Sequence, residues 1–255
     1  MNRPRIFAAL LGALMLAACE KNAVQVLPTS DVPGARIKFF NFGVGSPGVN
    51  FYADNTKMTA VLSATGSEAT TGVAYGGAGN GGVYLGIAPG TYSVTGRIAA
   101  TVDKDFSIAT LPVTAETGKF YSFYMSGIYN TTAKTSDAFV VEDPVVEPSN
   151  FAVAQVRFVN AISNASPLTL YALNTTDSIT TTVGTAIAYK GAGGFTALPQ
   201  GIYNLFARYT DSTTNKVSRN AVTILGGKVY TIGARGNITV ATGTNAPALD
   251  NTANR

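Results

Sequence analysis

Short segments in which hydrophobic and polar residues alternate recur along most of the chain, and a period of two predicts β-strands. In residues 92–98, Tyr92, Val94 and Ile98 fall on one predicted face and polar residues fall on the other. Residues 203–209 repeat this pattern. Turns rich in Gly, Pro, Asn and Thr separate the segments, and no convincing helical period follows the N-terminal segment. The pattern therefore predicts an all-β protein.

The chain also contains two copies of one longer pattern. Residues 35–41 match residues 154–160, and alternation in the first copy places Ile37 and Phe39 on one face of a strand and Lys38 on the other. Each copy spans roughly a hundred residues, enough for its own core. The many short strands in each copy favour two tandem antiparallel Ig-like β-sandwiches. Further segments match in the same order: 46–47 with 166–167, 51–55 with 170–174, 73–79 with 187–193, 89–92 with 200–203, and 118–121 with 227–230.

The edges of the two copies follow from this repeat. Residues 138–141 suit a closing strand of the first copy, whereas only Ala248 and Leu249 could contribute to one in the second, so we expect residues 242–255 to fray. Between the copies, two prolines favour an extended, semi-rigid linker. The sequence thus predicts β-sandwich domain 1 at residues 34–143, a linker at residues 144–150 and β-sandwich domain 2 at residues 151–255.

The N-terminal segment differs from the rest of the chain. Arg3 and Arg5 precede an apolar run over residues 6–18, which ends in small residues before Cys19, the only cysteine. This layout is typical of a secretory signal peptide, and the run is shorter than the roughly 20 residues that span a bilayer as a helix. Leu-Ala-Ala-Cys at residues 16–19 resembles the lipobox of bacterial lipoproteins.

The lipobox resemblance implies cleavage of a signal peptide at residues 1–18 and attachment of lipid to the sulfur of Cys19. Residues 19–33 would then form a lipidated polar tether, at most about 50 Å long. We therefore expect an exported protein held in a bacterial membrane through lipid on Cys19. An aspartate after the cysteine would favour retention in the inner membrane. Glu20 stands there instead and favours the outer membrane. Whether the protein faces the periplasm or the surface stays open.

Charge and composition narrow the choice of partners. The formal net charge is +4, of which Arg3 and Arg5 would leave with the signal peptide, and only 13% of residues are charged. Since no cluster of Lys and Arg is visible, we expect no nucleic-acid surface.

Candidate chemistry is sparse. Histidine is absent, which removes His-dependent nucleophilic catalysis and His-ligated metals, and a lipidated Cys19 would remove thiolate chemistry. Carboxylates remain: Asp103 and Asp105 fall in a turn, while Glu142 and Asp143 end a strand on opposite faces and make a poor glycosidase pair. We interpret them as solvated turn acids. The sequence predicts no enzyme, no metal site and no cofactor.

Residues 77–82 match the G-x-G-x-x-G pattern of dinucleotide sites. Such a site requires a helix directly after the glycines, because its N-terminus meets the pyrophosphate. The residues that follow, 83–87, suit a strand instead, so we interpret the glycines as a loop.

The aromatic segment 120–129 is the most distinctive candidate surface. Alternation places Tyr121 and Tyr129 on one face and Tyr124 on the other, so one set belongs to a core. The remaining tyrosines could form a binding surface for a sugar or a protein. We favour packing between sheets plus contact with a neighbouring domain. Tryptophan, the usual residue of sugar platforms, is absent.

Two tyrosines begin strands just after turns. Tyr92 and Tyr203 each follow a Gly-x step and a preceding proline. This placement is typical of a tyrosine corner, in which the hydroxyl bonds back to nearby backbone.

The order of these landmarks resembles the domain-of-unknown-function 4397 family of extracytoplasmic bacterial domains. In the second copy the matching residues are 154–161, 166–167, 168–171, 199–203 and 227–230, and the first copy is more divergent. The resemblance implies a β-sandwich and export, and it brings no catalytic residues.

We therefore expect a non-enzymatic, lipid-anchored protein of the cell envelope that acts as a structural, adhesive or protein-binding module. The alternative is a protein that binds polysaccharide through exposed tyrosines among Tyr121, Tyr124 and Tyr129. Its expected partners are the membrane, through Cys19, and an envelope protein or polysaccharide.

Overall fold

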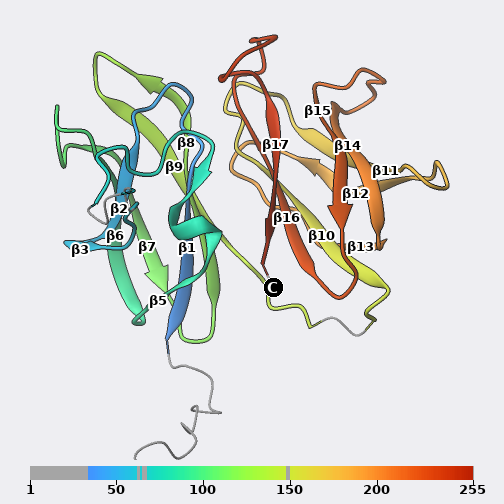
Figure 1. The fold of residues 1–255 in the computed structure, drawn as a ribbon, viewed down its shortest axis with the longest axis horizontal. Helices are drawn as coiled ribbons and strands as arrows, with labels where there is room; N and C mark the ends of the chain where they lie inside the picture. Colours follow the sequence, from blue (N-terminus) through green and yellow to red (C-terminus); the bar gives the residue numbers. More distant parts are fainter. Residues whose placement is uncertain (1–33, 62–63, 65–67, 148–149, 255) are drawn as a thin grey trace, which may run out of the picture. The chain divides into compact units, whose positions relative to one another are not determined.

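The computed structural model describes residues 34–61, 64, 68–147 and 150–254. The predicted signal peptide, Cys19 and the tether lie outside these residues. Within the described ranges the regular structure is β apart from one short 3-10 turn, η2, at Gly79–Gly82 (Figure 1). The prediction of an all-β fold with two β-sandwiches is confirmed.

The first β-sandwich, here sandwich 1, has nine strands among the described residues and packs two sheets face to face. In one sheet, β1 lies between β8 on one side and β4 and β5 on the other, and β9 closes the edge beyond β8. The second sheet has the order β3-β2-β6-β7. The strands are β1 (Ala35–Asn41), β2 (Val49–Ala53), β3 (Thr56–Lys57), β4 (Gly77–Ala78), β5 (Leu85–Ile87), β6 (Gly90–Ile98), β7 (Ser107–Ala115), β8 (Phe120–Asn130) and β9 (Thr135–Glu142).

Sandwich 2 repeats this arrangement. Its sheets have the orders β13-β10-β16-β17 and β12-β11-β14-β15. β1 lies parallel to β8 in sandwich 1 and β10 lies parallel to β16 in sandwich 2, whereas the other strand pairs described are antiparallel. The strands are β10 (Val153–Asn160), β11 (Leu168–Asn174), β12 (Thr180–Ile187), β13 (Thr196–Pro199), β14 (Gly201–Tyr209), β15 (Val217–Ile224), β16 (Val229–Arg235) and β17 (Ala248–Ala253).

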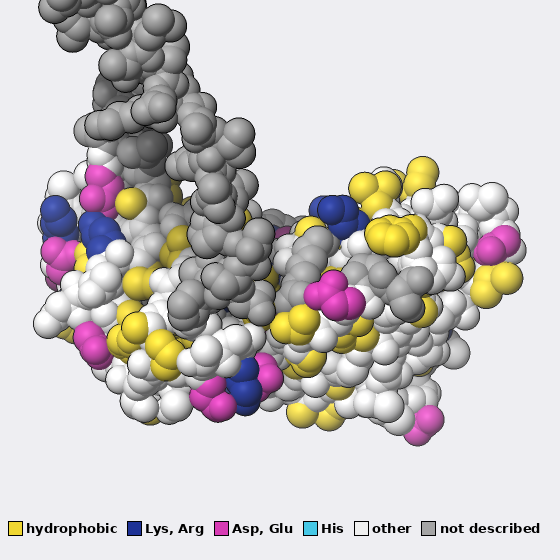
Figure 2. All heavy atoms as spheres, turned by 90° about the horizontal axis from the view of Figure 1, so that it is seen from below, with side chains coloured by type: hydrophobic (Ala, Val, Ile, Leu, Met, Phe, Trp, Pro, Cys, Tyr) yellow, Lys and Arg dark blue, Asp and Glu magenta, His cyan; other side chains and the backbone are white. Residues whose placement is uncertain are grey.

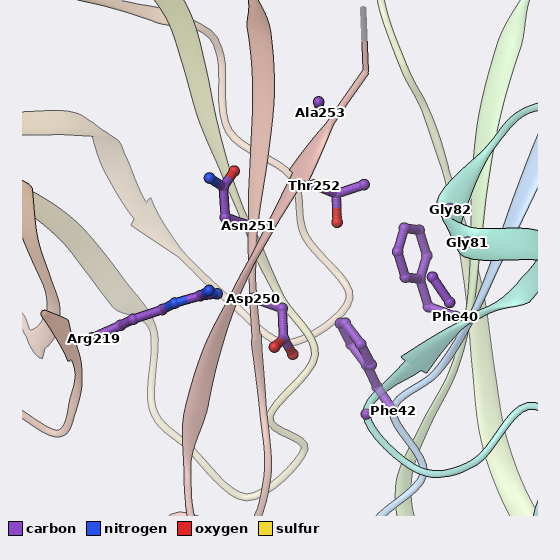
Figure 3. A pocket seen from close by; sticks show the side chains of 11 residues that line it. Phe40, Phe42, Gly81, Gly82, Arg219, Asp250, Asn251, Thr252 and Ala253 are labelled. Atoms are coloured by element: carbon purple, nitrogen blue, oxygen red, sulfur yellow. The ribbon is translucent and has the colours of Figure 1, made fainter. Parts of the chain in front are cut away.

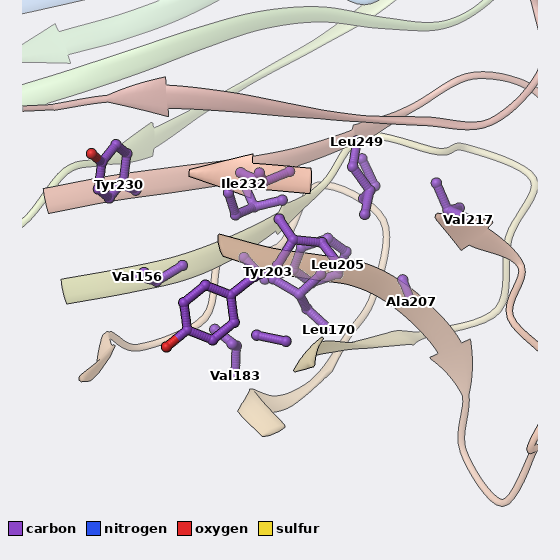
Figure 4. Close-up of a cluster of buried hydrophobic side chains, with 14 of the residues drawn as sticks. Val156, Leu170, Val183, Tyr203, Leu205, Ala207, Val217, Tyr230, Ile232 and Leu249 are labelled. Atoms are coloured by element: carbon purple, nitrogen blue, oxygen red, sulfur yellow. The ribbon is translucent and has the colours of Figure 1, made fainter. Parts of the chain in front are cut away.

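Each sandwich encloses its own hydrophobic core. In sandwich 1, Phe39 of β1 stacks on Phe51 of β2, with 5.1 Å between ring centroids, and Phe123 of β8 completes the aromatic group. In sandwich 2, Leu170 and Ile232 stand where sandwich 1 has Phe51 and Phe123, so aliphatic side chains fill more of this core (Figure 4). Full burial of such side chains stabilises a fold by about 1.5–3 kcal/mol each, so the cores account for the sandwich packing.

Both predicted tyrosine corners are present. The Tyr92 hydroxyl donates to the Ala88 carbonyl at 2.9 Å, and the Tyr203 hydroxyl donates to the Pro199 carbonyl at 2.7 Å. Tyr203 is buried, whereas Tyr92 is half-buried. The two residues thus have the structural role that their place after a turn predicts.

The closing strand of sandwich 2 is longer than the sequence suggests. Residues 138–141 fall within β9 as predicted, but β17 continues past Leu249 to Ala253 and pairs with β16 throughout. The expectation of fraying is therefore wrong for these residues. The reason is that backbone hydrogen bonds to β16, together with burial of Leu249, hold a strand whose remaining side chains are mostly polar.

Candidate functional site: the interface between the two sandwiches

A third hydrophobic cluster joins the two sandwiches. Phe40 and Tyr124 stack with 4.7 Å between ring centroids, and Tyr124 stacks in turn on Phe139 at 4.9 Å. Residues of sandwich 2 complete the cluster, so the outer face of the β1–β8–β9 sheet is covered rather than solvated. Its buried members are Phe40, Phe42, Tyr124, Phe139, Val141, Val159 and Ala161.

A buried ion pair lies at the edge of this cluster. A terminal guanidinium nitrogen of Arg157, on β10, contacts the carboxylate of Asp143, which directly follows β9. Both side chains are about 2% exposed. The rest of the guanidinium is also used: Nε donates to the Thr231 hydroxyl at 3.0 Å, and Nη1 donates to the Glu142 carbonyl at 3.0 Å. Every part of this buried cation therefore has a partner from one sandwich or the other.

Asp143 is satisfied on its other side by two hydroxyls of sandwich 1. The hydroxyls of Tyr84 and Ser122 each donate to Oδ2 at 2.6 Å. Burial raises the pKa of Tyr84 strongly, and the negative charge of Asp143 adds to this effect. The tyrosine therefore stays a neutral donor to the carboxylate at all ordinary pH values.

A second cation, Lys38 of β1, is buried a short distance away. Its Nζ donates to Oδ1 of Asn254 at 2.5 Å and lies 4.6 Å from the ring centroid of Tyr84. Loss of solvation lowers the pKa of Lys38 from 10.5 to about 8, although the negative charge of Asp143 acts in the opposite direction. Lys38 has a neutral amide as its direct partner, in contrast to Arg157.

These contacts repeat across an approximate two-fold relation between the sandwiches. Lys38 and Arg157 occupy matching positions of the sequence repeat. Asp143 and Asn254 also match, because their backbone N–H groups donate to equivalent carbonyls of β8 and β16 at 2.7 Å. Each cation thus reaches across the interface to the residue that directly follows the closing strand of the other copy. This is the geometry of an isologous dimer, built within one chain.

A second pair of contacts follows the same relation. The hydroxyl of Tyr189, from sandwich 2, lies 2.8 Å from the Ser126 hydroxyl and donates to Asp137 at 3.0 Å. At the matching place, the guanidinium of Arg235 lies 5.0 Å from the ring centroid of Tyr75. Tyr75 and Tyr189 belong to the repeated segments 73–79 and 187–193, so this sequence landmark marks interface residues.

The glycines that follow Tyr75 allow close approach of the two copies. Gly76 has φ +79°, and a Cβ there would lie 2.8 Å from the central guanidinium carbon of Arg235. Residues 77–82 form β4 and η2, and β5 rather than a helix follows them. Their interpretation as a loop is confirmed, since they lack the helix that a dinucleotide site requires.

A cavity of about 370 Å³ opens between the sandwiches beside these glycines (Figure 3). Phe42 and Gly81 line it from sandwich 1, and Asp250 lines it from β17. The charged side chains on its wall are hydrogen-bonded to other groups of the protein. Asp250 accepts a hydrogen bond from Arg235 Nε at 2.5 Å, and Nη1 of Arg219 donates to the Leu249 carbonyl at 3.0 Å.

The predicted tyrosine surface is not exposed at two of its three positions. Tyr121 is buried in the core of sandwich 1, where its hydroxyl accepts from the Glu116 backbone N–H at 3.2 Å. Tyr124 is buried in the cluster between the sandwiches, and Tyr129 is partly buried against the core. This arrangement is the favoured interpretation, packing between sheets plus contact with a neighbouring domain. The alternative prediction, that Tyr121 and Tyr124 are exposed and form a binding surface, is therefore wrong.

The candidate acids divide into two groups. Three of them are solvated acids, as expected. Asp103 pairs with Lys134 at 2.7 Å and Glu142 pairs with Lys119 at 3.1 Å, both at exposed positions, and Asp105 is exposed. Asp143 is buried, so its interpretation as a solvated turn acid is wrong. Sequence reasoning missed its role because the partner, Arg157, comes from the other copy.

The described residues offer no group of three or more Cys, Asp or Glu side chains that could hold a metal ion. In the same part of the chain, no helix has the length and apolarity needed to cross a membrane.

Comparison with known proteins adds a family. The sequence model described as "Domain of unknown function (DUF4397)" matches residues 35–171 and again residues 154–254. None of the curated proteins matches the chain. Among solved structures, a "putative cell adhesion protein" from Bacteroides ovatus is similar over 89% of this chain and 97% of its own, at 11% identity and a TM-score of 0.27. A protein with the same description from Bacteroides eggerthii is similar over 88% and 97%, at 12% identity and a TM-score of 0.23.

Proposed function

The chain belongs to the DUF4397 family, and from that premise we propose that it is a non-enzymatic, lipid-anchored protein of the bacterial cell envelope. Its two sandwiches act together as a structural, adhesive or protein-binding module. The lipid on Cys19 attaches it to the membrane, and Glu20 after the cysteine, in place of an aspartate, favours the outer membrane.

The observation that carries this proposal is the interface between the sandwiches. Its charged groups, Arg157, Asp143 and Lys38, are buried and bonded across the two copies, beside an aromatic cluster. A protein that transmits force or holds a partner benefits from two domains that behave as one body. Such use of buried charge fits a scaffold better than a reaction centre, where a charged group must face a substrate.

Non-enzymatic function is supported by the state of the remaining candidate groups. The chain contains no histidine, and the acids that sequence reasoning singled out are paired or exposed at turns instead of facing each other across a cavity. Hydrolysis of any member of a broad panel of chromogenic glycosides, abolished by replacement of one of these acids, would contradict the proposal.

The anchor is tested by Cys19→Ser. We expect the unaltered chain to incorporate labelled fatty acid in the bacterial cell and the variant to incorporate none, because the acceptor sulfur is lost. Labelling that persists in the variant would show that Cys19 is not the attachment site. Proteolysis of intact cells then decides whether the sandwiches face the surface.

The alternative is binding of polysaccharide through exposed tyrosines. Two of its three candidate residues, Tyr121 and Tyr124, are buried and do not face solvent. A glycan array probed with residues 34–255, which form one compact unit, tests what is left of it. We expect a flat response, and a specific signal that is lost in Tyr129→Ala would favour the alternative.

A further inference from the structure

A small apolar patch lies at the end of sandwich 2 where β10 begins. Phe151, Ile202 and Leu225, here called the basal patch, are 78%, 47% and 54% exposed. The Phe151 ring rests on the turn between β15 and β16, since a Cβ at Gly227 would lie 2.6 Å from its Cδ1. Large apolar side chains that stay this exposed and lie together on one end of a domain are typical of an interaction site.

A basic side chain accompanies the basal patch. Lys228 follows Gly227 directly in the same turn and is exposed. Figure 2, which views the molecule from this end, shows a group of hydrophobic side chains with a basic side chain nearby on the half that sandwich 2 occupies. An aromatic ring, aliphatic side chains and a lysine together suit the boundary between water and lipid, where each can place its apolar part inward and its polar part outward.

At the positions that match Leu225 and Ile202, the end of sandwich 1 is polar, so the fold does not require apolar side chains there. Leu225 and Glu116 occupy equivalent positions, because the backbone N–H of each donates to a tyrosine hydroxyl of the following strand at 3.2 Å. Thr91 stands where sandwich 2 has Ile202. Lys119, which matches Lys228, is engaged by Glu116 at 3.2 Å and by Glu142 at 3.1 Å. At these two positions the apolar side chains thus occur in sandwich 2 alone.

The basal patch lies at the same end of the compact unit as Gly34, its first residue. Gly34 precedes β1, and its carbonyl accepts from the backbone N–H of Gly118, in the turn that matches the one carrying the patch. Both β1 and β10 begin at the lower side of Figure 1. Residues 19–33 separate Cys19 from Gly34 and reach at most about 50 Å when fully extended.

We propose that the basal patch rests on the lipid surface in which Cys19 is anchored, with Phe151 at the boundary of headgroups and acyl chains. The inference rests on the proposed lipid anchor. Three side chains bind a bilayer weakly by themselves, but a short tether keeps them at an effective concentration in the millimolar range. The patch therefore orients an already anchored protein and holds sandwich 2 base-down on the membrane.

The absence of tryptophan from the chain provides a direct probe. Phe151→Trp in the full-length lipidated protein, reconstituted into vesicles of phosphatidylethanolamine and phosphatidylglycerol, places a unique fluorophore in the patch. We expect a blue-shifted emission and at least a two-fold loss of intensity when the lipids carry bromine on their acyl chains. Phe106→Trp is the matched control, because Phe106 is a 46% exposed phenylalanine in the loop at the opposite end of sandwich 1. It should show neither change.

A second variant tests the specific side chains. Adding Leu225→Glu to Phe151→Trp gives sandwich 2 the residue that sandwich 1 has at this position. We expect quenching by brominated lipid to fall to the level of the Phe106→Trp control, with an unchanged circular dichroism spectrum and unfolding midpoint.

The outcomes separate this inference from the anchor itself. If the protein does not float with the vesicles, the anchor has failed. If it floats but the Phe151→Trp fluorophore is not quenched, the anchor stands and the basal patch proposal is overturned. A blue shift that depends on protein concentration without quenching would assign the patch to a second copy. A blue shift before vesicles are added would assign it to another segment of the chain, and either result overturns the proposal.

Discussion

Sandwich 1 and sandwich 2 share one strand order, yet they carry different charges where they meet. The position of Lys38 holds Arg157 in the second copy, and the position of Asp143 holds Asn254. One cation of the interface therefore meets a carboxylate, whereas the other meets a neutral amide. The comparison shows that a repeated fold can preserve the geometry of its contacts while concentrating the electrostatic attraction in one of two equivalent sites.

The cores show a related difference. Sandwich 1 has three phenylalanines at the centre of its core. Sandwich 2 keeps one of them as Phe158 and has Leu170 and Ile232 at the other two positions. In the interface, Tyr124 of sandwich 1 occupies the position of Gly233 in sandwich 2. The interface is therefore filled mainly from sandwich 1, and the small residues of sandwich 2 provide the space.

Removal of Asp143 should distinguish the two equivalent sites most strongly. Asp143→Ala leaves the Arg157 guanidinium buried without its counter-charge, which costs roughly 3–5 kcal/mol of unfolding free energy in comparable cases. Asn254→Ala removes a neutral partner of the buried Lys38 ammonium and should cost less, about 1–3 kcal/mol. Urea unfolding of residues 34–255 measures both values.

The double variant Asp143→Ala/Arg157→Met serves as the control for this prediction. It removes the buried cation together with its partner, so we expect it to be more stable than Asp143→Ala alone. Equal stability of the two would mean that the ion pair is not the cause of the loss.

The pH dependence of stability should separate Lys38 from Arg157. The pKa of Lys38 is lowered to about 8 in the folded protein from 10.5, so between these pH values the unfolded chain binds a proton that the folded protein has released. The unfolding free energy contribution of Lys38 therefore rises as the pH increases from about 8 to 10.5.

Lys38→Met removes this titration and is the test variant. We expect the wild-type chain to gain stability relative to Lys38→Met between pH 8 and pH 10, measured by urea unfolding at each pH. Above pH 10 the buried tyrosines, whose pKa values are raised by burial, oppose the gain because only the unfolded chain ionises them. Parallel pH profiles of the two proteins would contradict the prediction.

Removal of the tyrosine hydroxyl should destabilise the two sandwiches by different but smaller amounts. Tyr203→Phe leaves the Pro199 carbonyl without its partner beside a buried ring and should cost about 1 kcal/mol of unfolding free energy. Tyr92→Phe removes the same bond at a half-buried position where water can replace it, so its cost should be smaller. A larger loss in Tyr92→Phe would reverse this comparison.

The smallest expected effect concerns Gly233, which leaves room in the interface for the aromatic side chains of sandwich 1. A Cβ at Gly233 would lie 3.0 Å from Phe42 Cε2, and Gly233 does not have a positive φ. Gly233→Ala should therefore lower the unfolding free energy slightly, by at most about 1 kcal/mol, as Phe42 shifts, and the thermal midpoint should fall slightly with it. Combining it with Phe42→Leu relieves the contact, and the effect of the added methyl should then disappear.

Much of the fold was predictable because it depends on local patterns. The alternation around Tyr92 and Tyr203, the turns before them and the repeat of residues 35–41 at 154–160 are enough to predict paired sandwiches and tyrosine corners. The interpretation of residues 77–82 as a loop also followed from what comes next in the sequence. Strand β17 was underestimated because backbone pairing, and not side-chain hydrophobicity, holds most of it.

The sequence by itself determined the two faces of each strand, including the placement of Lys38 opposite Ile37 and Phe39 on β1. Only the tertiary structure decided what covers the second face. Lys38, Arg157 and Asp143 look like surface charges in the sequence, and they are buried because the outer sheet of one copy covers that of the other. A period of two tells which side chains share a face, but the partner of that face lies more than a hundred residues away and leaves no local signal.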